Sequence, residues 1–359
     1  MDTSQILVDR ASPVLSGEEL DWPRLESFLR DQLEDVEGDF AVEQFPSGHS
    51  NLTYLVRFGD RELVIRRPPF GNPVKTAHDM GREFRVLSKL CNVFPPAPRP
   101  FLFCTDPNVI GDDFYVMERR TGVVLRRDNT PPLLSEDPTV ASRLCEAFVD
   151  NLAALHCVDY RAAGLAELGR PQGYIDRQVS GWIGRYEKAK TDDLVQLEQL
   201  GGWLEDHQPQ DGTPALIHND YKYDNLLLDS EDLAKIVAVL DWEMATVGDP
   251  LMDLGMTLCY WIEKNDPALL RQLAFGPTML EGSYSRHELV ERYANQVGIA
   301  VPDMLFYYCF GMFKLATIIQ QIYARFQRGL TDDTRFAGWN KQVEAIGIAA
   351  VTTLAAGKI

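Results

Sequence analysis

The sequence predicts an α+β protein with an N-terminal antiparallel sheet and a larger, mainly helical C-terminal part. Three runs with strand character follow one another closely, at residues 40–45, 52–58 and 62–67, and prolines stop the third. Turns rather than helices separate these runs, which favours antiparallel pairing. From about residue 139 onward, apolar residues instead recur at steps of three and four, the spacing of an amphipathic helix.

Around the predicted sheet, residues 21–36 form a leading amphipathic helix by the same spacing rule. A second helix is expected at about 78–90, and further strands near 99–104 and 113–117. The proline-rich segment 121–138 is typical of a linker. We therefore expect an N-terminal domain of residues 1–120 and a C-terminal domain of residues 121–359.

Composition limits the classes of function. The net charge of −18 makes this chain a poor candidate for binding nucleic acid, which requires clustered Lys and Arg. Six scattered cysteines without a CxxC pair argue against a zinc site or a disulfide framework and fit a reducing cytoplasm. The first residues lack a signal-peptide pattern, and no run approaches the ~18 apolar residues of a membrane span. We expect a cytoplasmic protein without membrane or nucleic-acid partners, and no protein partner can be inferred.

One polar loop within residues 215–241 carries the chemistry. The run His218-Asn219-Asp220-Tyr221-Lys222-Tyr223-Asp224-Asn225 lies between two short apolar runs, and another apolar run ends in Asp241-Trp242-Glu243. Burying such polar groups is costly unless they bond to one another or bind something. Turn capping explains one such residue, but not the whole set H-x-D-x4-N followed by D-x-E.

This set resembles the aminoglycoside phosphotransferase family, which includes choline-kinase-like enzymes and is a branch of the bilobal protein-kinase-like fold. The resemblance covers roughly residues 40–325. It implies that ATP and Mg²⁺ are used to phosphorylate the hydroxyl of a small molecule, a reaction that needs a base, metal ligands and cations. By this resemblance Asp220 is the catalytic base, and Asn225 and Asp241 are ligands of Mg²⁺, which prefers hard oxygen atoms.

For two residues near this set, the sequence allows two roles each. Lys222 could contact the transferring phosphoryl group or be a solvated surface lysine. Glu243 could assist a second metal ion or orient Asp241. His156 and His218 are interpreted as structural histidines. Asp249 followed by a proline predicts the N-cap of a helix.

The N-terminal part is expected to hold the nucleotide. Val64 and Arg66 share one strand face, and Glu83 lies beside the apolar face of its helix, where a carboxylate requires a cation. The kinase pattern pairs a strand lysine with a helix glutamate, and here Arg66 stands where that lysine is expected. Arginine stays charged and can bind phosphate with two nitrogens, but its geometry differs from that of lysine. The alternative is a pair of exposed arginines before a proline turn.

Two further segments are expected to contact ATP. The loop 47–51 has one glycine, and the backbone N–H groups of Gly48, His49 and Ser50 could cover the phosphates. A plain hairpin turn is the alternative. Another segment sits where the family places its hinge, whose backbone would bind adenine: Met117, Glu118 and Arg119.

The acceptor is a separate question, because a fold does not fix a substrate. The run at residues 64–71, VIRRPPFG, also resembles the subgroup whose members are sometimes fused to acyl-CoA dehydrogenases. That resemblance slightly favours a metabolic hydroxyl compound, such as a hydroxyacyl thioester, over an aminoglycoside. Two alternatives remain. Arg66 favours a non-catalytic nucleotide-binding scaffold, whereas a protein kinase is opposed by the missing APE-type activation loop after Asp241.

Overall fold

The computed structural model describes residues 8–45, 51–71, 79–127, 129–331 and 333–359. The chain divides into two compact units, each built from several segments. Unit 1 comprises Met1–Val124, Ala163–Leu165 and Leu226–Ala245, and unit 2 comprises Leu125–Ala162, Ala166–Asn225 and Thr246–Ile359.

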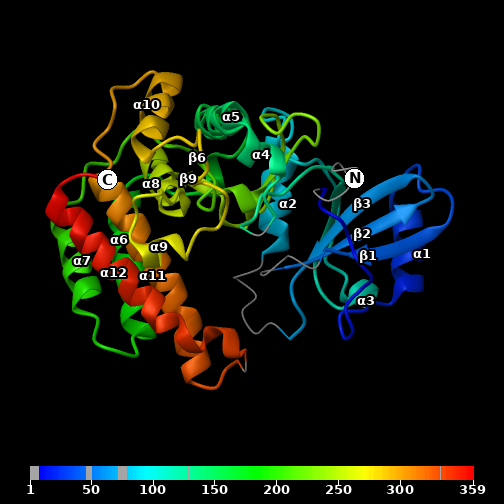
Figure 1. The fold of residues 1–359 in the computed structure, drawn as a ribbon. Coiled ribbons are helices and arrows are strands. Elements are labelled where there is room, and N and C mark those ends of the chain that lie inside the picture. The colour runs from blue at the N-terminus through cyan, green and yellow to red at the C-terminus, as the bar shows by residue number, and fades with distance from the viewer. Residues whose placement is uncertain (1–7, 46–50, 72–78, 128, 332) are drawn as a thin grey trace. The chain divides into compact units, whose positions relative to one another are not determined.

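Figure 1 labels most of the helices and strands that the described residues form. The helices are α1 (Trp22–Gln32), α2 (Met80–Leu90), α3 (Pro107–Ile110), α4 (Pro132–Glu136), α5 (Pro138–His156), α6 (Tyr174–Ala189), α7 (Val195–Asp206), α8 (Pro250–Tyr260), α9 (Ala268–Arg271), α10 (Arg286–Val297), α11 (Leu305–Gln327) and α12 (Trp339–Ala356). The strands are β1 (Phe40–Gln44), β2 (Leu52–Phe58), β3 (Arg61–Arg67), β4 (Pro100–Cys104), β5 (Phe114–Glu118), β6 (Ala215–Ile217), β7 (Leu226–Leu228), β8 (Ile236–Val239) and β9 (Thr246–Gly248).

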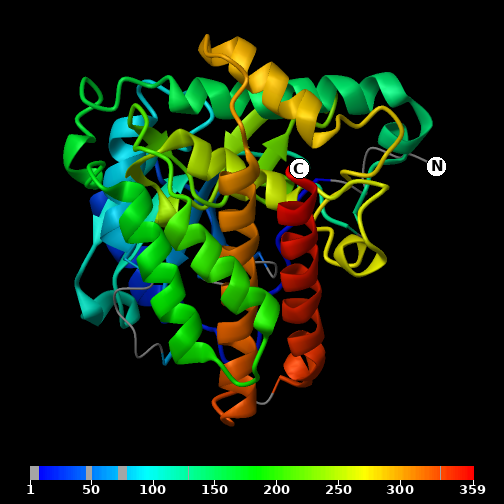
Figure 2. The ribbon, with the colours of Figure 1, turned by 90° about the vertical axis from the view of Figure 1, so that its left-hand side faces the viewer.

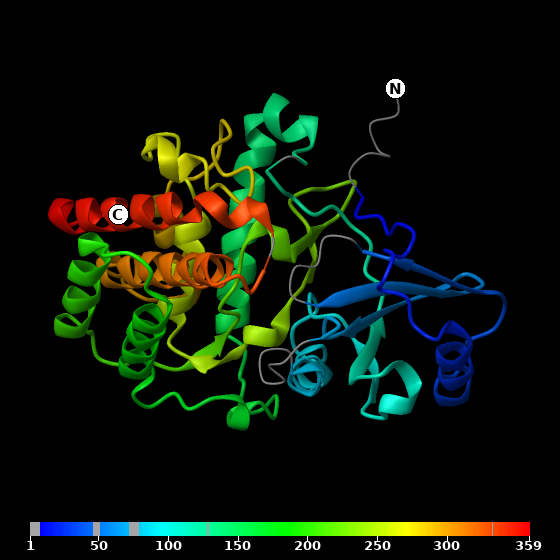
Figure 3. The same ribbon diagram turned by 90° about the horizontal axis from the view of Figure 1, so that it is seen from below.

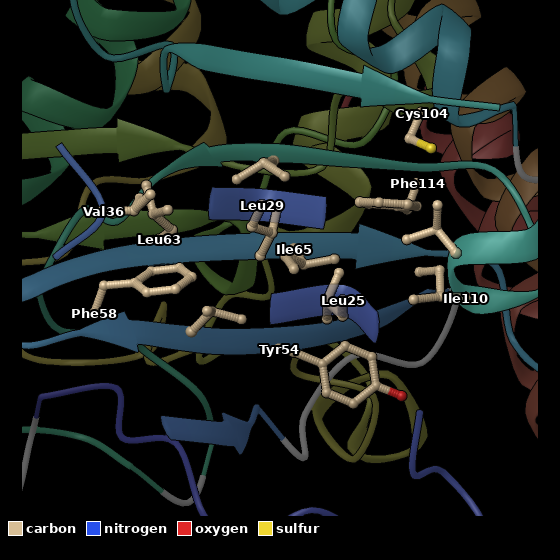
Figure 4. Close-up of a cluster of buried hydrophobic side chains, with 13 residues drawn as sticks. Leu25, Leu29, Val36, Tyr54, Phe58, Leu63, Ile65, Cys104, Ile110 and Phe114 are labelled. Atoms are coloured by element: carbon tan, nitrogen blue, oxygen red, sulfur yellow. The ribbon is translucent and has the colours of Figure 1, made fainter. Parts of the chain in front are cut away.

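Unit 1 is built on a five-stranded sheet with the order β1-β2-β3-β5-β4, and every neighbouring pair is antiparallel. The register of β2 and β3 runs from Leu52 opposite Arg67 to Phe58 opposite Arg61. One face of the sheet packs against α1 and α3, and Figure 4 shows Leu25 and Leu29 of α1 among the buried side chains of the strands. This apolar layer fixes which strand residues point to the opposite face.

The opposite face of the sheet carries the polar residues of interest. Because neighbouring strand residues point to opposite faces, Arg66 lies on the other side from Ile65, which packs in the α1 core. Helix α2 packs near β4 and β5 and supplies Glu83. The hairpin of β7 and β8 also belongs to unit 1, and a 3-10 turn at Trp242–Met244 follows it.

Unit 2 is mainly helical, and α11 is its central helix. The 23 residues of α11 are largely buried, and the helix packs against α6, α7, α8 and α12. Helices α11 and α12 run side by side (Figure 2), and α6 and α7 lie next to α11 (Figure 3). Strands β6 and β9 form a small antiparallel pair at the start of the polar loop.

The predicted α+β class, with its N-terminal antiparallel sheet and mainly helical C-terminal part, is confirmed. Residues 121–138, which were expected to be a linker, include the short helix α4. Proline is well tolerated in the first turn of a helix, where its missing N–H has no partner to lose, and α4 begins at Pro132. Among the described residues, we find no helix long and apolar enough to cross a membrane.

Candidate active site

In unit 2, the residues that follow β6 hold Asp220 through both of its carboxylate oxygens. Oδ2 accepts a hydrogen bond from Lys222 Nζ at 2.5 Å and another from Asn225 Nδ2 at 2.8 Å. Oδ1 accepts a hydrogen bond from the Tyr260 hydroxyl, at the end of α8, at 2.7 Å. Three different donors therefore fix the orientation of one carboxylate.

These donors also keep Asp220 ionised. Burial by itself would raise the pKa of Asp220, but the Lys222 ammonium and the hydrogen bonds from Lys222 and Tyr260 outweigh it and hold this pKa below its usual value. Lys222 Nζ lies 4.9 Å from the centre of the Tyr260 ring, a cation–π distance. Lys222 is therefore bound to its neighbours rather than freely solvated.

The carboxylate of Asp253, in α8, binds the backbone of the same loop. Its Oδ2 and Oδ1 accept hydrogen bonds from the backbone N–H groups of His218 and Asn219, each at 2.7 Å. His156 Nε2 lies 3.1 Å from Asp253 Oδ2, and its Nδ1 lies 2.7 Å from the Tyr293 hydroxyl. The interpretation of His156 as a structural residue agrees with these buried contacts.

Helix α8, which carries Asp253, begins with the predicted cap. The Asp249 side chain accepts hydrogen bonds from the backbone N–H groups of Leu251 and Met252. Pro250 occupies the first turn, where no hydrogen-bond donor is required. The cap and the proline thus fix where α8 starts, and with it the position of Asp253.

Unit 1 contains a second polar cluster, centred on Arg66. Arg66 Nη1 lies 2.6 Å from Glu83 Oε1, and Nη2 lies 3.1 Å from Asp241 Oδ1. Glu83 Oε1 also accepts a hydrogen bond from the backbone N–H of Trp242 at 3.1 Å. The ion pair expected between Arg66 and Glu83 is present, and Arg66 joins it to Asp241.

This cluster has more acidic groups than basic ones. Burial and the neighbouring Asp241 carboxylate raise the pKa of Glu243 to about 7, although Arg66 opposes the shift. Burial likewise raises the pKa of Glu83, against the effect of Arg66. Three carboxylates, those of Glu83, Asp241 and Glu243, thus act on one guanidinium. Asn51 Nδ2 donates to Glu243 Oε2 at 2.8 Å, which fixes that carboxylate.

Beside Arg66, unit 1 has a half-open pocket with a volume of about 90 Å³. One part of its wall is apolar and another is charged, a combination that suits a flat heterocycle attached to an anionic group. The lining residues are Thr53, Arg66, Glu83, Leu87, Pro98, Tyr115, Met117, Leu240, Asp241 and Trp242. Arg66 Nε is buried without a hydrogen-bond partner in the described part of the chain, which leaves a donor for an anion.

Of the other residues predicted to contact the nucleotide, one lines this pocket and two have side chains that contact other parts of unit 1. Met117 lines the pocket. The backbone N–H of Glu118 donates to Arg99 O, and the Glu118 side chain accepts from Arg99 N. Arg119 donates to the backbone carbonyl of Asp9 and lies over the ring of Phe45. The side chains of Glu118 and Arg119 are thus bonded elsewhere, and Gly48, His49 and Ser50 lie outside the described residues.

The donor atoms of the two predicted metal ligands suit Mg²⁺. Asn225 Nδ2 donates to the backbone oxygen of Asp220 and to its Oδ2, so the amide oxygen Oδ1 is the atom able to bind a cation. Asp241 adopts a left-handed backbone conformation with φ +67°, which is uncommon for a residue other than glycine. Hard oxygen atoms of this kind, together with phosphate oxygens and water, are the usual ligands of Mg²⁺.

Sequence reasoning missed two residues close to Asp220. Tyr260 lies 40 residues away in the sequence, and Lys314, which donates to Asn219 O at 3.2 Å, lies 95 residues from Asn219. Both belong to apolar helical segments, where periodicity gives a core interpretation. A lysine inside an otherwise apolar helix was the one available signal, because a buried cation needs a partner.

Comparison with known proteins identifies the family. A family model described as the phosphotransferase enzyme family matches residues 41–289. Acyl-CoA dehydrogenase family member 10 of Mus musculus is 33% identical over 321 residues, covering 89% of this chain but 30% of that protein. This chain therefore spans less than a third of that relative's length. The match confirms the predicted likeness to the subgroup related to acyl-CoA dehydrogenase family members.

Two solved structures share the fold. A Ralstonia eutropha protein provisionally named an aminoglycoside phosphotransferase aligns with a TM-score of 0.79 at 29% identity, over 93% of this chain and 99% of that one. An APH(2")-type protein in complex with GDP and kanamycin aligns with a TM-score of 0.62 at 16% identity, over 91% and 98%. The predictions of a protein-kinase-like fold and of a phosphotransferase are confirmed. The chain belongs to the phosphotransferase enzyme family.

Proposed function

We propose that this protein transfers the γ-phosphoryl group of ATP to a hydroxyl of a small molecule and depends on Mg²⁺. The observation that carries this proposal is the half-buried Asp220 carboxylate, whose two oxygens are bound by Lys222, Asn225 and Tyr260. A carboxylate held in this way is suited to accept a proton at one fixed point. The six free cysteines fit a reducing compartment, so we place the reaction in the cytoplasm.

In this proposal Asp220 is the catalytic base. Its Oδ2 already accepts from Lys222 and Asn225, so we assign the acceptor hydroxyl to Oδ1, which has a lone pair beyond the one used by Tyr260. The acceptor oxygen forms a bond to the γ-phosphorus, the bond from that phosphorus to the bridging oxygen breaks, and ADP leaves. The hydroxyl proton passes to Asp220. Lys222 would offset negative charge near the transferred group.

We assign the nucleotide to the pocket beside Arg66. Its apolar wall, with Met117, would hold adenine, and Arg66 would bind phosphate oxygens. The backbone oxygen of Glu118, the backbone of Arg119 and the predicted loop residues Gly48, His49 and Ser50 would make the remaining contacts with ATP. Glu83 keeps Arg66 in place. Mg²⁺, when bound by Asn225 and Asp241, would neutralise charge on the phosphates.

For the acceptor, we propose a metabolic hydroxyl compound, such as a hydroxyacyl thioester, in preference to an aminoglycoside. The curated relatives carry the name of an acyl-CoA dehydrogenase family, which favours an acyl-type metabolite. The Lys222 ammonium beside Asp220 also favours a neutral or anionic acceptor, because a polycationic amine would meet a like charge there.

A product assay tests the proposal. The protein is incubated with ATP, MgCl₂ and a panel that contains hydroxyacyl thioesters and kanamycin-type amines, and phosphorylated products are identified by mass spectrometry. We expect a phosphorylated hydroxyacyl compound together with an equal amount of ADP. Turnover of the amines alone would overturn the acceptor assignment. The absence of any phosphorylated product across a broad panel of alcohols would contradict the proposed phosphotransferase activity.

One observation favours a second candidate, a nucleotide-binding scaffold without catalysis. Arg66 stands where the kinase pattern has lysine and is bonded to both Glu83 and Asp241. A scaffold would bind ATP with the same affinity in the wild type and in Asp220→Asn, with no ADP formed by either. The proposed enzyme would instead lose turnover in Asp220→Asn and keep its affinity for ATP.

A further inference from the structure

Lys314 is a buried cation in the middle of α11. Its side chain lies among core residues of unit 2, with 3% of the residue exposed. Its Nζ donates a hydrogen bond to the backbone oxygen of Asn219 at 3.2 Å and lies 5.6 Å from the centre of the Trp182 ring. A buried ammonium bound mainly to one carbonyl oxygen calls for a functional explanation.

Keeping this charge in the core is unfavourable for folding. Burial lowers the pKa of Lys314, although the carboxylates of Asp220 and Asp253 act in the opposite direction. Replacing a buried charge by an apolar side chain of similar volume is often neutral or stabilising. Fold stability alone therefore does not explain a lysine at this position.

The carbonyl that Lys314 binds belongs to the peptide unit joining Asn219 to Asp220. Asn219 has a left-handed backbone with φ +68°, a conformation that asparagine adopts more readily than most residues. Asp253 holds the N–H of Asn219, and Lys314 holds its carbonyl oxygen. The backbone on the N-terminal side of Asp220 is thus fixed by one anion and one cation.

We propose that Lys314 is a positioning residue, which fixes the peptide before Asp220 and so sets the direction of the carboxylate that accepts the acceptor's proton. This inference rests on the proposed function for its catalytic consequence. Its structural part, the ordering of the Asn219–Asp220 peptide, is independent of that function. Lys314 is too deeply buried to be a substrate contact, so we assign it no direct role in the transfer.

The test compares Lys314→Met with the wild type in turnover, denaturation and backbone hydrogen exchange. We expect kcat to fall about tenfold or more, with KM for ATP changed less than about twofold, because misplacement of the base affects the transition state rather than nucleotide binding. Amide exchange in the peptide covering residues 216–223 should become faster by about tenfold. The urea midpoint should stay equal to that of the wild type or rise.

Thr317→Val is the matched control. Thr317 is also fully buried on α11, but its hydroxyl donates to Phe313 O of the same helix, away from the catalytic loop. We expect this variant to keep both kcat and the exchange rate of the loop. Lys314→Arg retains a donor, so it should restore part of the lost kcat and part of the loop protection, even if the Met variant folds poorly.

Each outcome decides between the positioning role and its alternatives. A Lys314→Met protein with wild-type kcat and wild-type loop exchange overturns the inference. A loss of kcat without faster exchange also overturns it, because Lys314 would then act by another route. Should the wild type show no phosphoryl transfer at all, the proposed function fails. Hydrogen exchange in Lys314→Met and Thr317→Val then still decides the structural role of Lys314.

Discussion

The hydroxyl of Tyr260 donates a 2.7 Å hydrogen bond to Oδ1 of Asp220. Tyr260 ends α8, the helix that also supplies Asp253 to the backbone of the same loop. A single helix thus fixes both the backbone before Asp220 and one oxygen of its carboxylate. The ring of Tyr260 packs edge-to-face against Phe275 at 5.0 Å, so its hydroxyl has little freedom to turn away.

Removal of this hydroxyl should slow the proposed reaction. In Tyr260→Phe the ring and its packing stay, but Asp220 loses the donor at Oδ1. We expect kcat to fall about tenfold, the value of one hydrogen bond to a charged group, with KM for ATP unchanged. Steady-state kinetics together with a thermal melt would measure both effects.

Tyr186→Phe is the control for this variant. Tyr186 is also buried in unit 2, and its hydroxyl has no hydrogen-bond partner within the described residues. Its removal should leave kcat unaltered and should not lower the melting temperature. Equal losses of kcat in both variants would show that Tyr260 matters only for packing.

The Arg66 cluster predicts a graded effect on nucleotide binding. Arg66→Met leaves the buried Glu83 carboxylate without its cation, which should cost about 3–5 kcal/mol of the free energy of unfolding. The same change should raise KM for ATP by about tenfold or more, because a phosphate contact is lost. Arg66→Lys keeps the charge but not the forked geometry, so both values should be intermediate.

Denaturant titrations and ATP saturation curves should place Arg66→Lys between the wild type and Arg66→Met, both in the free energy of unfolding and in KM for ATP. Glu83→Gln separates the ion pair between Glu83 and Arg66 from the phosphate contact of Arg66. It weakens the ion pair but keeps the guanidinium. An Arg66→Met protein with the wild-type KM for ATP would contradict a nucleotide site beside Arg66.

Much of the fold could be predicted from short-range patterns. Strand β2 has the bounds that were predicted, 52–58, and the two short apolar runs that flank the polar loop are the strands β6 and β7. These runs are apolar and are stopped by polar clusters, so local sequence determines them. Strand β9 was missed because it has three residues and is defined by its pairing with β6, about thirty residues earlier.

The candidate site could be predicted in part, because its central residues lie within one local motif. Asp220, Lys222 and Asn225 are bonded to one another within six residues of sequence. Tyr260 and Lys314 come from distant helices, and only tertiary packing brings them to the loop. Sequence spacing carries no signal of such contacts.

Helix α8 should be sensitive to small changes where it crosses α11. A Cβ at Gly255 would lie 2.4 Å from the backbone oxygen of Tyr307, closer than any real contact. Gly255→Ala must therefore push α8 and α11 apart, which should lower the free energy of unfolding by about 1–3 kcal/mol. Because α8 carries Asp253 and Tyr260, kcat should fall as well.

Gly202→Ala in α7 is the matched substitution, since no atom of the described chain lies within 4 Å of a Cβ placed there. Alanine favours the helix and should raise the free energy of unfolding by about 0.5–1 kcal/mol. Urea denaturation of both variants should give opposite signs. Destabilisation of the same size in both would refute the close crossing of α8 and α11.

The buried charge of Lys314 makes stability depend on alkaline pH. The pKa of Lys314 is lowered from its ordinary value of 10.5 by burial, against Asp220 and Asp253, with Arg185 lowering it further. Between the lowered and the ordinary pKa the unfolded chain binds more protons, so stability rises with pH in that window. The wild type should therefore gain stability relative to Lys314→Met as the pH rises toward the ordinary lysine pKa of 10.5.

Urea denaturation of both proteins across that range measures the difference directly. Thr317→Val serves again as the control, because it removes a polar group but no titrating one, and its difference from the wild type should be constant with pH. The prediction is contradicted if the difference in the free energy of unfolding between the wild type and Lys314→Met stays constant with pH. It is also contradicted if rising pH stabilises the variant relative to the wild type.

The most direct test of the central claim is the rate of phosphoryl transfer from γ-labelled ATP in Asp220→Asn, measured at saturating ATP, Mg²⁺ and acceptor. Asparagine keeps the size of the side chain but cannot take up the proton of the acceptor. The account predicts that kcat falls by about a hundredfold to ten-thousandfold while binding of ATP is retained. Transfer at the wild-type rate by a folded Asp220→Asn protein would contradict it.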